Sequence, residues 1–320
     1  MMTSKKSPEK LIALTGATGF VGGQIMVEAL AAGHRVKALT RRPVPVIENV
    51  EWVNGDLNNQ DALSALFETA DAFIHTAGLV KAKTKADFFA VNTDAVANIL
   101  KLAEKAKTGD GFHFILVSSL AARHPELSPY AKSKRGGEEA LQSAAIDFPF
   151  TIVRPPAVYG PGDKEILKLF KTMKRGFAPV AGDDKNVFSL VHVRDLSRAI
   201  LSALHHEPAY GETLEPDDGK RGGYTMAEVA RVAEAVLGRK INTLEIPGPV
   251  LHLFAAANEM FARFGSEPAI LSRHKVREMT HPNWVSDPTS HAKISHWKPK
   301  IDLQTGFLET VAWYRGNNLL

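Results

Sequence analysis

The feature that most constrains the fold is a glycine-rich stretch, residues 15–22, between a short apolar run and a helix-like segment. Gly16 permits a tight turn, Gly19 lets the backbone approach a pyrophosphate, and Gly22 lets a helix pack close to a sheet. The start of that helix would offer free N–H groups and a partial positive charge to phosphate groups. The sequence therefore predicts a strand, a phosphate-binding turn and a helix, in that order.

Short apolar runs alternate with longer helical periodicities through the first half of the chain. The expected strands are 11–14, 36–39, 50–53, 72–75, 112–117 and 151–153. The expected helices are the one that follows the glycines, 61–69, 87–107 and 129–145. This order predicts an α/β fold with a doubly wound parallel sheet, a Rossmann fold, with helices on both faces.

The regularity loosens after Pro155, where prolines and glycines crowd together. Further elements are expected as a strand at 188–193 and helices at 166–175, 195–204, 226–237, 250–264 and 303–313. We therefore expect a dinucleotide-binding core at 8–160, to which 185–205 returns. The segments 161–184 and 206–320 would form a smaller, mostly helical substrate-binding region. The helix at 250–264 is apolar enough to consider membrane contact, but its length favours a core or pocket-lining helix.

Composition excludes several classes of protein. A hydrophobic content of 44% and a charged content of 23% exclude a disordered chain, and no apolar run is long enough for a membrane span. The net charge of +4 is small and the Lys and Arg residues are scattered along the chain, so nucleic acid is not an expected partner. Cysteine is absent, which excludes disulfides and thiolate metal sites, and the His residues lack ligand spacing. We expect no metal and, with no signal-peptide core near the start, a cytoplasmic location.

The residues that end the second expected strand bear on the cofactor. Thr40 stands where an acidic residue would bind the 2′-hydroxyl of NAD, and Arg41 and Arg42 follow it. Guanidinium groups can bind a 2′-phosphate with charge-assisted hydrogen bonds, whereas an Asp would repel it. The sequence favours NADP(H), with NAD(H) as the alternative. Asp56 and Leu57, after the third strand, are placed to contact the adenine ring.

Three residues form a candidate catalytic set. Tyr130 and Lys134 lie four positions apart, so they share one face of the expected helix, and Ser119 ends the fifth strand. A nearby ammonium is expected to lower the pKa of the tyrosine toward a value useful for proton transfer. Ser119 could then hydrogen-bond the oxygen of a substrate.

Together these motifs resemble the extended short-chain dehydrogenase/reductase superfamily, also called the NAD-dependent epimerase/dehydratase family. The likeness covers nearly the whole chain and includes TGATGFVG at 15–22, GDL at 55–57, HTAG at 75–78, YAKSK at 130–134, RPPAVYGPGD at 154–163 and VHVRDLSRAI at 191–200. It implies that Ser119, Tyr130 and Lys134 are the catalytic triad, with Lys134 also holding the nicotinamide ribose.

The resemblance also implies further cofactor contacts and an assembly. The additional cofactor-binding residues are Thr18, Phe20, Val21, Thr76, Ala77, Gly78, Val117, Pro155, Ala157 and Val158. Asn92 matches an Asn of the family, for which a structural and a catalytic role stay open. Family members often dimerise through helices that correspond to 87–107 and 129–145, so a homodimer is one expected arrangement.

Departures from the family pattern point to one branch. Dehydratases carry acidic residues after the fifth strand, where this chain has Ser119-Leu120-Ala121. Epimerases place an Arg that binds a diphosphate where Phe188 stands, although Lys185 or Arg221 could substitute. The tail, with HPNW at 281–284 and WKP at 297–299, resembles dihydroflavonol reductases and 3β-hydroxysteroid dehydrogenases.

We therefore expect an NADP(H)-dependent oxidoreductase that acts on a carbonyl or secondary alcohol of a small, largely apolar substrate. A nucleotide-sugar epimerase is the alternative. A non-catalytic dinucleotide-binding structural or sensor protein is the second alternative.

Overall fold

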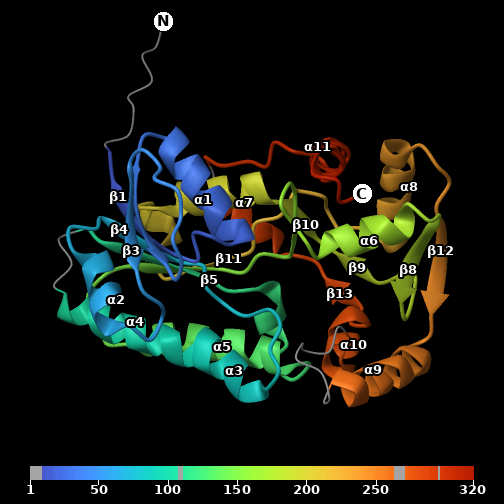
Figure 1. The fold of residues 1–320 in the computed structure, drawn as a ribbon, viewed down its shortest axis with the longest axis horizontal. Coiled ribbons are helices and arrows are strands. Elements are labelled where there is room, and N and C mark those ends of the chain that lie inside the picture. The colour runs from blue at the N-terminus through green and yellow to red at the C-terminus, as the bar shows by residue number, and fades with distance from the viewer. Residues whose placement is uncertain (1–8, 107–110, 263–270, 295) are drawn as a thin grey trace, which may run out of the picture.

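A seven-stranded parallel sheet in the order β11-β6-β5-β4-β1-β2-β3 organises the structure (Figure 1). It is a computed structural model that describes residues 9–106, 111–262, 271–294 and 296–320. The expected domain start at residue 8, and the expected helix ends at 107 and 263–264, lie outside these ranges. The strands are β1 (Leu11–Thr15), β2 (Arg35–Thr40), β3 (Val50–Asn54), β4 (Ala72–His75), β5 (His113–Val117), β6 (Phe150–Val153) and β11 (Thr213–Leu214).

Helices cover both faces of this sheet, which confirms the predicted doubly wound Rossmann arrangement. On one face, α1 (Phe20–Ala31) and α7 (Val193–Ala203) pack against the sheet and share one apolar core with it. On the other face lie α2 (Gln60–Phe67), α4 (Ala95–Lys105) and α5 (Pro129–Gln142), as Figure 1 shows. The chain winds outward in opposite directions from β1 and β4, so a ligand crevice is expected at their carboxyl ends.

The helix expected at 87–107 is interrupted. It consists of α3 (Lys85–Phe89), a π-helical turn at Ala90–Asp94 and α4. Single π-helical turns inside helices occur frequently at functional sites, and this one carries the buried side chain of Asn92.

The second region contains three two-stranded parallel sheets and several helices. The strand pairs are β7 (Ala157–Tyr159) with β10 (Leu190–His192), β8 (Phe177–Ala181) with β12 (Asn242–Ile246), and β9 (Val187–Phe188) with β13 (Asn283–Trp284). The helices are α6 (Ile166–Met173), α8 (Met226–Leu237), α9 (Gly248–Ala262), α10 (Arg273–Met279) and α11 (Leu303–Gly316). No helix in the described ranges is long and apolar enough to cross a bilayer.

Two expectations for this stretch are wrong. The strand expected at 188–193 divides into β9 and β10 because Phe188 and Leu190 pair with different partners, and neither strand joins the large sheet. Conversely β11, inside the expected substrate-binding region, is the edge strand of the large sheet.

Asp195 lies in the first turn of α7 but does not cap the helix. His192 is the N-cap residue, and its Nδ1 atom accepts a hydrogen bond from the backbone N–H of Arg194 at 3.3 Å. The buried carboxylate of Asp195 instead accepts the backbone N–H groups of Lys300 and Ile301, at 2.7 and 2.8 Å. It therefore fastens the segment that precedes α11 to the core.

Candidate active site

The glycine-rich turn is packed too tightly for any larger residue. Gly16 has a φ of +78°, and a Cβ atom there would lie 2.4 Å from Thr76 Oγ1 and 2.8 Å from the Ala77 nitrogen. A Cβ atom on Gly22 would lie 2.2 Å from the Gly16 carbonyl oxygen. The turn after β1 therefore lies directly against the loop after β4, and the expected cofactor residues of both loops are brought together.

The start of α1 fits a phosphate group. Its N-cap residue is Gly19, which has no side chain to cap the helix, and the first turn holds no acidic residue. Thr18 and Gly19 are exposed, so the first N–H groups of the helix are open to an anion. Phe20 is only partly exposed, and Val21 packs against the core. We therefore expect these two side chains to hold the turn in place rather than to contact a phosphate.

The loop after β2 presents both arginines to solvent. Thr40 Oγ1 donates a hydrogen bond to the Arg42 carbonyl oxygen at 2.7 Å, which holds the turn while Arg41 and Arg42 stay exposed. The backbone N–H of Gly55 donates to the Thr40 carbonyl at 2.9 Å and brings the end of β3 beside it. Asp56 is exposed there, whereas Leu57 is half-buried against the core on the α2 side.

Lys134 is buried behind the carboxyl ends of β4 and β5. Its Nζ atom donates a hydrogen bond to the Val117 carbonyl oxygen at 2.8 Å, and a Cβ atom on Gly78 would lie 3.6 Å from it. Burial lowers the pKa of Lys134 to about 8, a shift that the carboxylate of Glu138 opposes. The ammonium therefore lies where the loop after β4 passes the start of α5.

The pKa of Tyr130 moves in the direction opposite to the one expected from the sequence. Burial raises it to about 12, the hydroxyl of Ser119 opposes the rise, and the charge of Glu278 adds to it. The Lys134 ammonium is not among these influences, because it is directed at the Val117 carbonyl. The phenol is consequently protonated at neutral pH, which suits a proton donor.

Asn92 has a bracing role in the structure. Its amide donates to the Leu79 carbonyl at 3.0 Å and to Ser133 Oγ at 2.9 Å, and its Oδ1 atom accepts the Leu79 N–H at 2.8 Å. These bonds fix the loop after β4 to the helix that carries Tyr130 and Lys134. Asn92 therefore has at least the structural one of the two roles that the sequence leaves open.

A cavity of about 420 Å³ adjoins the catalytic candidates. Ser119, Tyr130 and Ala157 are among the residues that line it. Most of the remaining wall is apolar and is formed by Val80, Ala121, Pro179, Val180, Ala181, Val187, Phe188, Met226, Met279 and Trp284. Such a lining with few polar groups is typical of a site for an apolar ligand.

The last three expected cofactor residues follow β6. Ala157 is exposed and lines the cavity, Val158 is partly buried and Pro155 is buried. The carbonyl of Pro155 accepts the Leu120 N–H at 2.9 Å, which ties this segment to the loop after β5. The arginines and Asp56 lie at the ends of β2 and β3 and do not line the cavity. The candidates therefore form two groups along one edge of the sheet.

Sequence reasoning missed a buried acidic residue of the cavity wall. Glu278, on α10, is 7% exposed and lines the cavity together with Tyr130. Its carboxylate accepts hydrogen bonds from Ser128 Oγ and, at 2.9 Å, from Lys275 Nζ. Nothing in the local pattern around residue 278 marks it, because Ser128 and Tyr130, which it meets at the cavity, lie about 150 residues earlier in the sequence.

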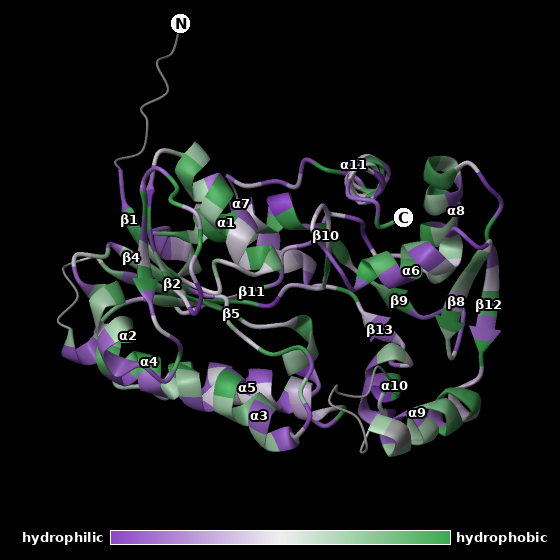
Figure 2. Cartoon of the chain, in the orientation of Figure 1, coloured by the Kyte–Doolittle hydropathy of each residue, from purple (hydrophilic) through white to green (hydrophobic). Residues whose placement is uncertain are grey.

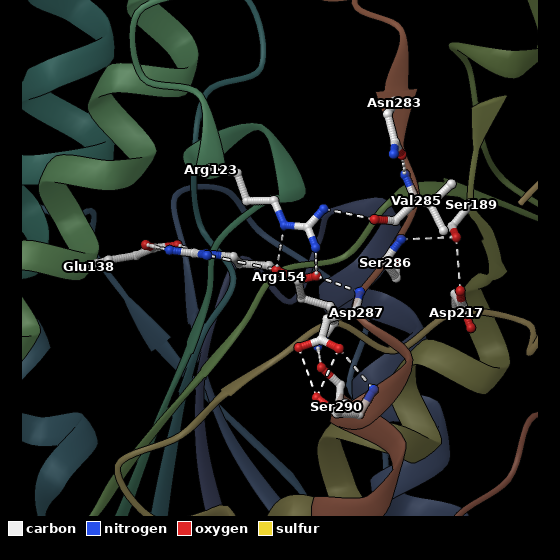
Figure 3. Close-up of polar contacts among 12 residues, drawn as sticks. Arg123, Glu138, Arg154, Ser189, Asp217, Asn283, Val285, Ser286, Asp287 and Ser290 are labelled. Carbon is white, nitrogen blue, oxygen red and sulfur yellow. Dashed lines mark hydrogen bonds and ion pairs between the residues drawn. The ribbon is translucent and has the colours of Figure 1, made fainter. Parts of the chain in front are cut away.

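A network of ion pairs joins the core to the wall of the cavity (Figure 3). Arg154 binds Glu138 through two hydrogen bonds of 2.9 and 2.6 Å, and Arg123 pairs with Glu215 at 2.7 Å. Arg123 also donates to the Val285 carbonyl at 2.7 Å, directly after β13. The network therefore fixes the strand that carries Trp284 relative to α5. Within the described ranges, no group of three or more His, Asp or Glu side chains is placed to hold a metal ion.

Comparison with known proteins gives a family and several relatives. Residues 12–214 match the model of the NAD dependent epimerase/dehydratase family. The chain is 40% identical over 310 residues to the ceramide reductase of Caulobacter vibrioides, covering 95% of this chain and 94% of the relative. It is 24% identical to a 3β-hydroxysteroid dehydrogenase/Δ5→4-isomerase of Mycobacterium tuberculosis, covering 95% and 90% of the two chains. Among solved structures, MoeE5 in complex with UDP-glucose and NAD matches with a TM-score of 0.72 at 18% identity, covering 96% of this chain and 99% of the other.

Proposed function

This chain belongs to the NAD-dependent epimerase/dehydratase family of NAD(P)-dependent enzymes, and from that premise we propose that it is an NADP(H)-dependent reductase of a ketone-bearing, ceramide-like lipid. The observation that carries the proposal is the largely apolar cavity, which Ser119 and the protonated Tyr130 help to line. The name of the relative at 40% identity supports the lipid class.

The cofactor assignment follows from the fit of the turn and the loop after β2. The close approach of Gly16 and Gly22 and the uncapped start of α1 suit a pyrophosphate. Arg41 and Arg42 are the groups that would hold a 2′-phosphate, and Asp56 and Leu57 would lie beside the adenine. NAD(H) is the alternative, and a comparison of the two affinities decides between them.

The bound cofactor would supply a hydride to the carbonyl carbon. Tyr130 Oη donates its proton to the carbonyl oxygen as the C–H bond forms, so the ketone becomes an alcohol and the phenol a phenolate. Ser119 hydrogen-bonds the same oxygen and orients it. Lys134, one helical turn from Tyr130, would hold the nicotinamide ribose.

The cavity is better suited to a lipid than to a sugar nucleotide. Phe188 lines it where an Arg would neutralise a diphosphate, and Asp183 and Asp184 line the same wall and would repel one. Neither Lys185 nor Arg221 is among the described residues that line the cavity. We assign segments 161–184 and 206–320, apart from β11, to the side that binds the substrate.

The proposal is tested by following NADPH consumption with three substrates: a ceramide-like amide that bears a ketone, a short apolar ketone and UDP-glucose. We expect turnover of the lipid ketone, weaker turnover of the short ketone and no change in the sugar nucleotide. Epimerisation of UDP-glucose at an enzymatic rate would instead establish the epimerase. If NADPH binds but no carbonyl compound is reduced, and Tyr130→Phe changes nothing, the chain is a dinucleotide-binding protein without catalysis.

A further inference from the structure

Helix α9 is apolar on two sides, although only one side is packed. Its inner side chains Leu251 and Ala255 are buried against Val276 of α10. Its outer side carries four large apolar side chains, whose exposed fractions are 40% for Val250, 72% for Leu253, 63% for Phe254 and 53% for Met260. Their spacing places them on one stripe along the helix, and Figure 2 shows the hydrophobic colour running along α9.

Such a stripe is unusual for a surface that faces only water. Charged and polar side chains normally occupy the outer face of a surface helix, and hydrating exposed Leu and Phe side chains costs free energy. Within this helix, the charged Glu259 lies beside the stripe and pairs with Arg273 at 2.9 Å. The outer stripe itself contains no charged residue.

Cationic side chains lie on α10, which packs against α9, and at the start of α3. Arg273, Lys275 and Arg277 are exposed on α10, and Lys83 and Lys85 are exposed at the start of α3. Burial and the charges of Lys85 and Arg277 lower the pKa of His274, so the charge of Lys85 is felt at α10. Figure 1 shows α3, α9 and α10 along the same side of the molecule.

We propose that the outer stripe of α9, with the cationic side chains of α10 and the start of α3, docks onto an anionic lipid bilayer. An apolar helix face beside Lys and Arg residues is the combination that lies in the interface of anionic membranes. Docking of this kind buries the apolar side chains among acyl chains and places the cations among phosphate headgroups.

A second copy of the chain is a poorer occupant of this surface. In a two-fold symmetric dimer the same patch meets itself, so the Lys85 and Arg277 side chains would approach cations of the same kind. A bilayer that contains anionic lipids satisfies both the apolar stripe and the cations.

The proposed surface is continuous with the substrate cavity. Helix α10 contributes Lys275, Glu278 and Met279 to the cavity wall, and Met279 is 44% exposed. Val80, which precedes the lysines of α3, also lines the cavity and is 65% exposed. A lipid substrate that enters from the bilayer would therefore pass α10 and Val80 on its way to Tyr130. This last point rests on the proposed function, whereas membrane docking itself does not.

The test is flotation of the full chain with vesicles, without cofactor or substrate. The vesicles are made of phosphatidylcholine alone or with phosphatidylglycerol. We expect the wild type to float with the anionic vesicles, and the double variant Leu253→Glu/Phe254→Glu to lose at least about tenfold in the bound fraction. The matched control is Leu308→Glu on α11, a side chain that is 50% exposed on another part of the surface. It should bind vesicles like the wild type.

Three outcomes would overturn the proposal. In the first, the wild type does not float with anionic vesicles. In the second, the double variant floats to the same extent as the wild type. In the third, the wild type is a dimer that binds no vesicles, and the double variant is a monomer. Melting temperature and NADPH affinity, expected to be unchanged in all variants, report on folding. If the protein binds vesicles but reduces no lipid ketone, that result contradicts the proposed function and leaves the membrane proposal standing.

Discussion

The cofactor side and the substrate side of the candidate site differ in how well they tolerate amino-acid substitutions. On the cofactor side, backbone and side-chain atoms around Gly16 and Gly22 leave no space for one methyl group. On the substrate side, the cavity is lined by side chains, and α9 exposes Leu253 and Phe254 on its outer surface. The cofactor side is thus defined by backbone geometry, and the substrate side by the identity of side chains. This difference explains why one fold can retain its cofactor while its substrate varies.

The largest expected effect is at the junction of the two sides. Tyr130→Phe removes the proton donor but keeps the ring, so turnover of a ketone should fall by about 10²–10⁴-fold. The affinity for NADPH should be unchanged, because the variant retains Lys134 and the glycine turn. Steady-state kinetics and fluorescence titration measure the two quantities. Equal loss of both would mean that Tyr130 binds the cofactor rather than moving a proton.

On the cofactor side, Gly22→Ala should weaken NADPH binding by roughly 100-fold and destabilise the fold by about 1–3 kcal/mol. The added methyl group would lie 2.2 Å from the Gly16 carbonyl, so the turn must shift. The control is Gly316→Ala at the end of α11, where nothing lies within 4 Å of the added atom. Titration and thermal unfolding of both variants test this, and a silent Gly22→Ala would show that the turn is not rigid.

The two arginines in the loop after β2 should make the protein bind NADPH more tightly than NADH. Replacing Arg41 and Arg42 with Ala removes charge-assisted hydrogen bonds to a 2′-phosphate, so NADPH affinity should fall by roughly 10–100-fold. NADH affinity should stay the same, because NADH lacks that phosphate. Dissociation constants for both cofactors provide the measurement. A parallel loss for NADH, or equal wild-type affinities, would contradict the NADP(H) preference.

The smallest expected effect is a shift in a pH profile. The carboxylate of Glu278 adds to the rise in the pKa of Tyr130 that burial causes, so Glu278→Gln should lower that pKa. Oxidation of the alcohol needs the phenolate, so its rate should begin to rise at a lower pH in the variant. Ser128 and Lys275 can both still bond the amide. An unchanged pH profile would show that Glu278 does not act on Tyr130.

The strand, glycine turn and helix of the cofactor side could be predicted because their signals are local. Gly16, Gly19 and Gly22 follow one strand, and Tyr130 and Lys134 share one helical turn, so spacing alone places them. The substrate side depends on contacts between distant segments. β8 pairs with β12 and β9 with β13, Asp195 binds the backbone at 300 and 301, and Glu278 meets Tyr130 across the cavity.

The direction of the Tyr130 pKa shift could not be predicted from the sequence either. Its spacing correctly places Lys134 one turn from Tyr130, and from that nearness a lowered tyrosine pKa is expected. The structure shows that burial dominates instead and that Lys134 donates to the Val117 carbonyl. Desolvation depends on the whole packed surroundings, which no local pattern encodes.

The central claim is that NADPH at the sheet edge delivers hydride to a carbonyl held in the apolar cavity beside Tyr130. It is tested most directly by incubating the protein with NADPH deuterated at C4 and a ceramide-like ketone, followed by mass spectrometry of the product. The account predicts one deuterium on the new carbinol carbon with the wild type and essentially none with Tyr130→Phe. An unlabelled lipid, together with UDP-glucose converted to its epimer, would contradict it.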